Sequence, residues 1–213
     1  MLARNSKPRY HSPGGFPLEA KLKLAFLAAA LTVASTAAAH ADCKSDLESI
    51  MQAHLKAGPY HTSMDMVSGG KTRKIETDVI LPSSFHMKMP EMETIMLKQG
   101  TWMKMGGTWK AMPAAMSAMT GNMVQDAMAH GLKNASNFKC GSSAEFDGQS
   151  YPLYEFDSSG EAMGIKATSH IRLFKGSNNL PVGMIVEGEA MGVKSMTTQH
   201  IKYDPAITIN PPQ

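Results

Sequence analysis

Methionine is the residue type with the widest chemical possibilities in this chain of 213 residues, which contains nineteen of them. Many recur at a spacing of two residues, as in strands, and others at a spacing of three or four, as in helices. The first kind comprises Met64 and Met66, Met87 and Met89, and Met103 and Met105, and the second Met112, Met116, Met119 and Met123. A flexible thioether packs around irregular apolar ligands, or offers soft sulfur to a soft metal. The pattern therefore predicts either an apolar binding surface or a copper site.

The copper hypothesis depends on histidines that lie among these methionines. The candidate Cu(I) ligands are His86 with Met87, Met89, Met92 and Met96, or His61 with Met64 and Met66. Alternate side chains of a strand point to opposite faces, so His86 is expected on the face opposite Met87 and Met89. Because one site could not easily use all three, the apolar interpretation is favoured. Cu(I) binding is kept as the alternative.

No known catalytic pattern accompanies the methionines. The sequence contains no G-x-S-x-G, H-E-x-x-H, P-loop or glycine-rich dinucleotide motif. The histidines beyond residue 41 are widely separated, and a single histidine on a strand is more often solvated or hydrogen-bonded than catalytic. They are His54, His61, His86, His130, His170 and His200. We therefore expect neither an enzyme nor a cofactor.

The first 41 residues have the features of an export signal. Lys21 and Lys23 precede the apolar run 24–39, and Ala39-His40-Ala41 is a small-x-small site that signal peptidase can cut. No later segment approaches the ~20 apolar residues of a membrane span. Cys43 also lacks the preceding small residues of a lipobox. We expect a signal peptide over 1–41 and a single periplasmic domain over 42–213, without a transmembrane anchor.

Removal of this segment would also remove the apparent basicity of the chain. The chain has 21 basic and 18 acidic residues, and residues 1–41 contain five of the basic and one of the acidic ones. The remaining chain therefore has 16 basic and 17 acidic residues. A nearly neutral domain has no basic surface for nucleic acid.

Two cysteines, Cys43 and Cys140, remain in the expected domain. An even count in an oxidising compartment favours a disulfide. A pair of thiolate metal ligands is the less favoured alternative, because neither cysteine is part of a CxxC or CxxxH spacing. The bridge would join the N-terminal helix to the strand region after the second helix.

The order of elements is expected to be helix, strands, helix, strands. Apolar residues at helical spacing predict a helix over 46–56, which Gly58-Pro59 ends. The period then changes to two, and short strands separated by glycine or proline turns predict a series of hairpins. These strands are expected near 60–66, 72–81, 84–89, 93–98 and 101–110, the last divided at Gly106-Gly107. Pro113 suits the first turn of a second helix over 113–132.

The last third of the chain is again rich in strands. The segment 161–166 (EAMGIK) is echoed at 189–194 (EAMGVK), and His-Ile follows each copy. We interpret the echo as two strands that alternate in the same way.

Several of these stretches together resemble the LolA/LolB and LppX/LprG group of bacterial envelope proteins. They are 94–97 (TIML) with 101–110 (TWMKMGGTWK), a helix, 180–182 (LPV) and the ending 203–212 (YDPAITINPP). The resemblance implies an α+β fold, a curved antiparallel β half-barrel closed by two helices around an apolar cavity. No motif in it is catalytic.

The resemblance also implies a function. The protein is expected to hold an apolar, acyl-chain-like ligand, as a carrier or sensor of a lipid or an acylated protein, with an envelope protein as a possible partner. The residues expected to line the cavity are Met64, Met66, Met87, Met89, Met103, Met105, Met112, Met116, Met119 and Met123.

Overall fold

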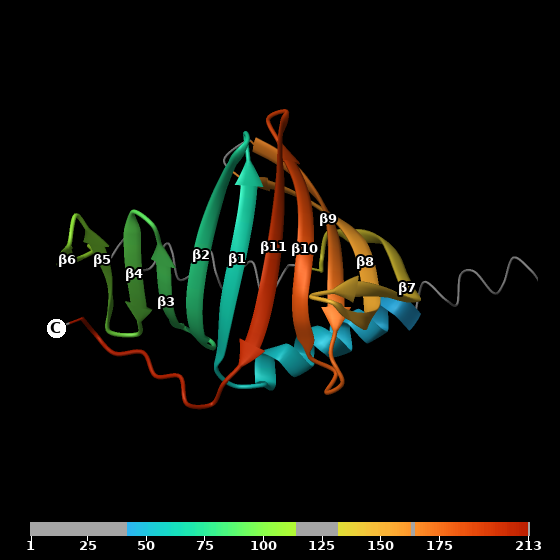
Figure 1. Ribbon diagram of the computed structural model, residues 1–213, viewed down its shortest axis with the longest axis horizontal. Coiled ribbons are helices and arrows are strands. Elements are labelled where there is room, and N and C mark those ends of the chain that lie inside the picture. Colours follow the sequence, from blue (N-terminus) through green and yellow to red (C-terminus); the bar gives the residue numbers. More distant parts are fainter. Residues whose placement is uncertain (1–41, 114–131, 163–164, 213) are drawn as a thin grey trace, which may run out of the picture. The chain divides into compact units, whose positions relative to one another are not determined.

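A computed structural model describes residues 42–113, 132–162 and 165–212 of the chain. Eleven strands form one open antiparallel sheet in the order β6-β5-β4-β3-β2-β1-β11-β10-β9-β8-β7 (Figure 1). Almost every strand pairs with its neighbour in sequence, whereas β1 pairs with β11 and so joins the two ends of the domain. The strands are β1 (Tyr60–Ser68), β2 (Lys71–Ile80), β3 (Ser84–Met89), β4 (Met92–Leu97), β5 (Gly100–Met105), β6 (Thr108–Ala111), β7 (Ala135–Phe146), β8 (Gln149–Ala162), β9 (Ile165–Lys175), β10 (Pro181–Ala190) and β11 (Val193–Tyr203).

Hairpin turns account for the succession of strands, and the structure confirms the predicted hairpins to within a few residues. Gly69 and Gly70 connect β1 to β2 with φ angles of 56° and 73°. Positive φ at both central residues is typical of a type I′ turn, whose twist matches that of the strands it joins and which glycine adopts without steric cost. This turn sets the register that places Ser68 opposite Lys71 and Tyr60 opposite Val79.

A single helix, over residues 42–56, is present in the described part of the chain. It begins four residues before the predicted start, and Gly58, with a φ of 90°, follows its end. Leu47 and Ile50 lie on one side of the helix and are 1% and 0% exposed. They pack on Tyr154 and Phe156 of β8 and on Leu173 of β9. In Figure 1 the helix, blue to cyan, lies along one end of β8, β9 and β10.

The predicted disulfide is confirmed. Cys43 of the helix is bonded to Cys140 of β7, with 5.6 Å between their Cα atoms. Cys43 is buried, and Cys140 packs beside the cluster that holds the helix on the sheet. The bridge therefore ties the N-terminal helix to an edge strand of the sheet.

The expectation of an α+β half-barrel closed by two helices is wrong, because the described residues form almost entirely antiparallel sheet, with one helix. The described residues form one open sheet whose end strands, β6 and β7, do not pair with each other. A fifteen-residue helix is about 22 Å long, whereas eleven strands extend over about 48 Å, so helix 42–56 covers only part of one face. The expected helix over 113–132 falls on residues 114–131, outside the described residues.

The expected signal peptide over 1–41 also lies outside the described residues and stays a prediction. Within the described ranges, no helix has both the length and the apolar character needed to cross a bilayer.

Candidate functional site

One face of the sheet carries most of the methionines that the structure describes. Because side chains alternate along a strand, the register of the ladders identifies which residues share a face. Met64 of β1 lies opposite Gln199 of β11, which lies opposite Met184 of β10. On the other side of β1 the same alternation extends through β2 to β3, β4 and β5. This methionine face contains Met64, Met66, Met87, Met89, Met92, Met96, Met103, Met105 and Met184.

Rows of side chains cross the methionine face from strand to strand. In one row Thr77, Met87, Thr94 and Met103 follow each other on β2, β3, β4 and β5. The next row consists of Val79 on β2, Phe85 on β3, Met96 on β4 and Thr101 on β5. Met112, just beyond β6, joins this second row because its backbone N–H donates to the carbonyl of Thr101 at 2.8 Å.

The two halves of the methionine face differ in what covers them. On β8 and β9 the face is filled by aromatic and aliphatic side chains that pack against Leu47 and Ile50. On β1 to β5 most of the methionines are only half-buried, and Met105 is 64% exposed. Helix 42–56 therefore leaves the methionine-rich half with apolar side chains that are accessible in the described structure.

A cluster of aromatic side chains packs the C-terminal end of the helix against the sheet. Nδ1 of His54 lies 2.6 Å from the hydroxyl of Tyr203, and the rings of His54 and Tyr60 are 4.6 Å apart. Burial lowers the pKa of His54, which favours the neutral imidazole. Burial also raises the pKa of Tyr60 to about 12 and raises that of Tyr203. The cluster is therefore uncharged at neutral pH, and we assign it a packing role.

The opposite face, here called the charged face, carries alternating charges. Glu76, Lys88, Glu93 and Lys104 form one row across β2, β3, β4 and β5. Nζ of Lys104 lies 3.6 Å from the carboxylate of Glu93. Opposite charges on neighbouring strands stabilise the pairing of those strands.

Histidines on the charged face are bonded to carboxylates. His86 contacts Glu93 at 2.7 Å, His170 contacts Asp157 at 2.8 Å and His200 contacts Asp147 at 2.7 Å. Burial opposes ionisation of Glu93, but His86 and the nearby Lys104 outweigh it and lower the pKa of that carboxyl. Hydrogen bonds from Asn137 first, and then from His170, lower the pKa of Asp157. The contacts at Glu93 and Asp157 therefore stabilise the charged forms of these two carboxylates.

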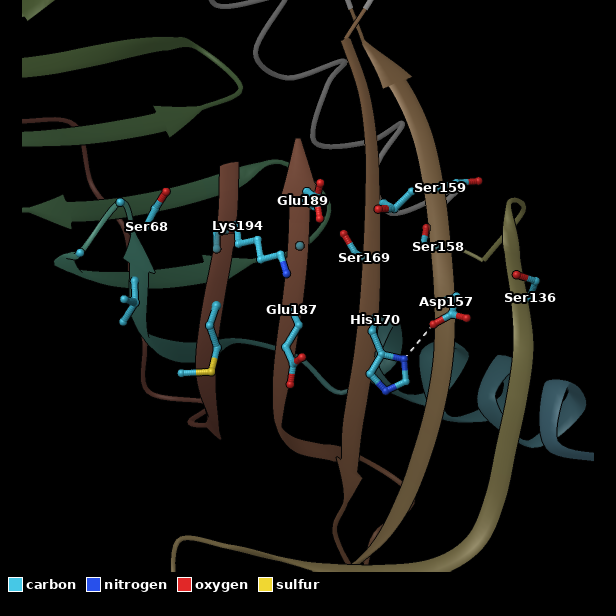
Figure 2. Close-up of a pocket in the computed structure, with 17 residues that line it drawn as sticks. Ser68, Ser136, Asp157, Ser158, Ser159, Ser169, His170, Glu187, Glu189 and Lys194 are labelled. Atoms are coloured by element: carbon cyan, nitrogen blue, oxygen red, sulfur yellow. Dashed lines mark hydrogen bonds and ion pairs between the residues drawn. The ribbon is translucent and has the colours of Figure 1, made fainter. Parts of the chain in front are cut away.

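A hollow of about 770 Å³ lies on the charged face near the β1–β2 and β10–β11 turns. Figure 2 shows Glu187, His170 and Asp157 side by side in it, from β10, β9 and β8, with the His170–Asp157 bond dashed. Further residues in its lining carry hydroxyl, carboxylate and ammonium groups, among them Ser159, Thr168, Glu189 and Lys194. This lining offers charged and hydrogen-bonding groups beside the apolar side chains of Val67 and Met196.

The structure brings the predicted methionines of the strands together but does not describe all of those predicted. Met64, Met66, Met87, Met89, Met103, Met105 and Met112 share one face, whereas Met116, Met119 and Met123 lie outside the described residues. That these residues line a ligand cavity stays a prediction. His86 of the copper hypothesis lies on the charged face, opposite Met87, Met89, Met92 and Met96.

Sequence reasoning missed the pairing of the histidines with acidic residues. The alternation of residues along the strands does contain a signal for this pairing. It places His61, His86, His170 and His200 on the polar faces of their strands, opposite the apolar side chains. Their partners come from neighbouring strands, so only the register reveals them. In the described part of the chain, no three His, Cys, Asp or Glu side chains are arranged to hold a metal ion.

An open antiparallel sheet with a packed N-terminal helix is consistent with a LolA-like fold, and similarity to a solved structure confirms the resemblance at the level of the fold. The Mycobacterium tuberculosis lipoprotein LppX has a TM-score of 0.54 and 8% identity, over 79% of this chain and 98% of that protein. An identity this low supports similarity of fold alone. No protein family and no curated protein sequence matches the chain.

Two further structures are geometrically more distant. A DUF1329 family protein from Desulfovibrio piger has a TM-score of 0.38 and 9% identity, over 80% of this chain and 95% of that one. MucB of the Pseudomonas aeruginosa MucA/MucB complex has a TM-score of 0.39 and 11% identity, over 78% of this chain and 59% of its own.

Proposed function

We propose that the protein is an exported binding protein that holds an apolar, chain-like ligand, such as the acyl chain of a lipid or of an acylated protein, on its methionine face. The observation that supports this function most strongly is the row Thr77, Met87, Thr94 and Met103 with its neighbouring rows, which extend over β2 to β5. The buried residues of helix 42–56, Leu47 and Ile50, pack instead on β8 and β9. Unbranched thioether side chains adapt to a guest of variable shape.

The size and character of the methionine face agree with this proposal. Half-buried methionines on β1 to β5 present apolar atoms to the surroundings. When a ligand covers these atoms, binding is favoured by about 25 cal/mol for each Å² of apolar surface removed from water. An enzyme would need converging polar groups there, and the polar residues within these rows are mainly threonines. Binding without chemistry, as a carrier or a sensor, is therefore the proposed role.

Introduction of charge on this face tests the proposal. Met87→Glu and Met103→Glu place carboxylates in the centre of the row, and either should reduce uptake of a fluorescent fatty acid at least tenfold, because an ionised group opposes apolar contact. Thr72→Glu is the matched control: it adds the same charge to the exposed residue Thr72 of β2, on the charged face. Unchanged uptake by both Met variants, with native circular dichroism, would contradict the proposed site.

Export is the second part of the proposal. The Cys43–Cys140 disulfide is the kind of bond that persists in an oxidising compartment. The purified periplasmic protein should begin at Asp42 when its N-terminus is sequenced. A cytoplasmic, unprocessed chain with reduced cysteines would contradict this part without affecting the ligand assay.

A further inference from the structure

Three methionines come together at one end of the methionine face. Met89 and Met92 flank the two-residue turn between β3 and β4 and lie opposite each other in the ladder. Glu93 of β4 lies opposite Lys104 of β5. Because antiparallel strands run in opposite directions, the residue before Glu93, Met92, lies beside the residue after Lys104, Met105. Met105 in turn flanks the β5–β6 turn at the same end of the sheet. We call Met89, Met92 and Met105 the methionine triplet.

The strand register places the three methionine side chains next to one another on adjacent strands. Opposed residues on antiparallel strands have Cα atoms roughly 4.5–5.5 Å apart and side chains on the same face. Methionine has several rotatable bonds that let the thioether move over the neighbouring side chain. A single ion above Met92 could therefore contact a sulfur from each of three adjacent strands.

Packing does not account for all members of the triplet. Met105 is 64% exposed, and Met89 and Met92 are only half-buried. An exposed methionine contributes little hydrophobic stabilisation, since that term is proportional to the area removed from water. The end of the face beside the two turns is therefore open to a small solute.

We propose that Met89, Met92 and Met105 bind Cu(I) through their three thioether sulfurs. Soft, uncharged sulfur ligands favour Cu(I), whereas Zn²⁺ and Cu(II) prefer sites that include imidazole, thiolate or oxygen ligands. Of the charged residues next to the triplet in sequence, Lys88, Glu93 and Lys104 lie on the charged face, and Glu91 lies in the β3–β4 turn. The site lies at one end of the methionine face and does not use His86, Met87 or Met96.

Anaerobic competition for Cu(I) against a chromogenic chelator tests this proposal on the purified full chain. The triple variant Met89→Leu, Met92→Leu and Met105→Leu removes the sulfurs and keeps the apolar volume. The matched control Met64→Leu, Met66→Leu and Met184→Leu removes three sulfurs from elsewhere on the same face. Wild type and control should bind one equivalent, and the triplet variant should bind at least tenfold more weakly.

Nuclear magnetic resonance of the methionine methyl groups gives a second readout. Addition of Ag(I), a soft monovalent substitute for Cu(I), should shift three methyl signals in the wild type, and mutation should assign them to the triplet. Absence of competitive binding by the wild type, or retention of binding by the triplet variant, would overturn the proposal. Equal loss in the control variant would also overturn it. Fatty acid uptake by copper-free wild type is measured separately, so failure of the copper site and failure of the apolar site are distinguishable.

Discussion

The imidazole of His61 on β1 lies 2.7 Å from the carboxylate of Asp78, its cross-strand partner on β2. The other ring nitrogen is 2.8 Å from Glu76, whose second oxygen accepts a hydrogen bond from Ser63. The hydrogen bond to Asp78 is the largest influence and raises the pKa of His61, with a smaller contribution from Glu76, while burial acts in the opposite direction. His61 is therefore held between two carboxylates that favour its protonated form.

This arrangement predicts a pH dependence of stability. Because the folded pKa of His61 is raised, its contribution is fully present below the unfolded pKa near 6.5 and is lost as pH rises through the folded value. The Asp78→Asn variant should therefore lose more stability relative to wild type at pH 5.5 than at pH 8.5. The difference should stay below about 1 kcal/mol, because the His61 side chain is 39% exposed.

Urea unfolding at the two pH values measures this difference, and titration of the His61 ring signals by nuclear magnetic resonance measures its cause. Asp78→Asn should lower the pKa of His61 more than Glu76→Gln does. A His61 pKa unchanged in Asp78→Asn would show that the contact is not formed in solution.

The disulfide predicts a large effect on stability. Cys43 and Cys140 are separated by 97 residues, and closure of a loop of this length stabilises the folded state by about 4–5 kcal/mol in the chain-entropy model. The double variant Cys43→Ser and Cys140→Ser should lose most of this stability in urea unfolding, and reduced wild type should behave in the same way. Thiol labelling of unfolded, unreduced protein should detect no free thiol; two labelled cysteines would refute the bond.

Packing of helix 42–56 on the sheet predicts that two leucines of that helix contribute differently to the stability of the protein. Leu47→Ala should destabilise the protein by about 2–5 kcal/mol, because Leu47 is 1% exposed and its loss leaves a cavity against Tyr154 and Leu173. Leu55→Ala is the control, and it should cost less than about 1 kcal/mol, because Leu55 is 37% exposed. Similar midpoints of thermal unfolding for the two variants would mean that the helix is not packed on the sheet.

Close packing at Gly183 predicts that alanine is not tolerated there. A Cβ atom at this position would meet the ring of Phe146 and would lie 2.6 Å from the carbonyl oxygen of Gln199. Gly183→Ala should therefore destabilise by about 1–3 kcal/mol, as overpacking does. Gly160→Ala on β8 meets nothing within 4 Å and is the control. Equal stability of the two variants in urea would show that the β7–β8 hairpin does not pack over Gly183.

Local features of the structure follow directly from the sequence. Alternation along β1 and β3 placed Met64 with Met66 and Met87 with Met89 on one face, and it placed His86 on the other. Gly69-Gly70 and Gly106-Gly107 marked hairpins, and two cysteines in a chain expected to be exported indicated the disulfide. These inferences succeed because side-chain alternation and turn geometry depend on only a few consecutive residues.

Tertiary structure alone decided how the hairpins combine. The pairing of Tyr60 on β1 with Tyr203 on β11 joins residues from the two ends of the domain, and no local pattern indicates it. The histidine–carboxylate pairs, the methionine triplet and the open end strands β6 and β7 depend on such registers. Register between distant strands is determined by which side chains are buried together. On β8 and β9 these side chains are buried against Leu47 and Ile50 of the helix, whereas most of the methionines of β1 to β5 stay accessible.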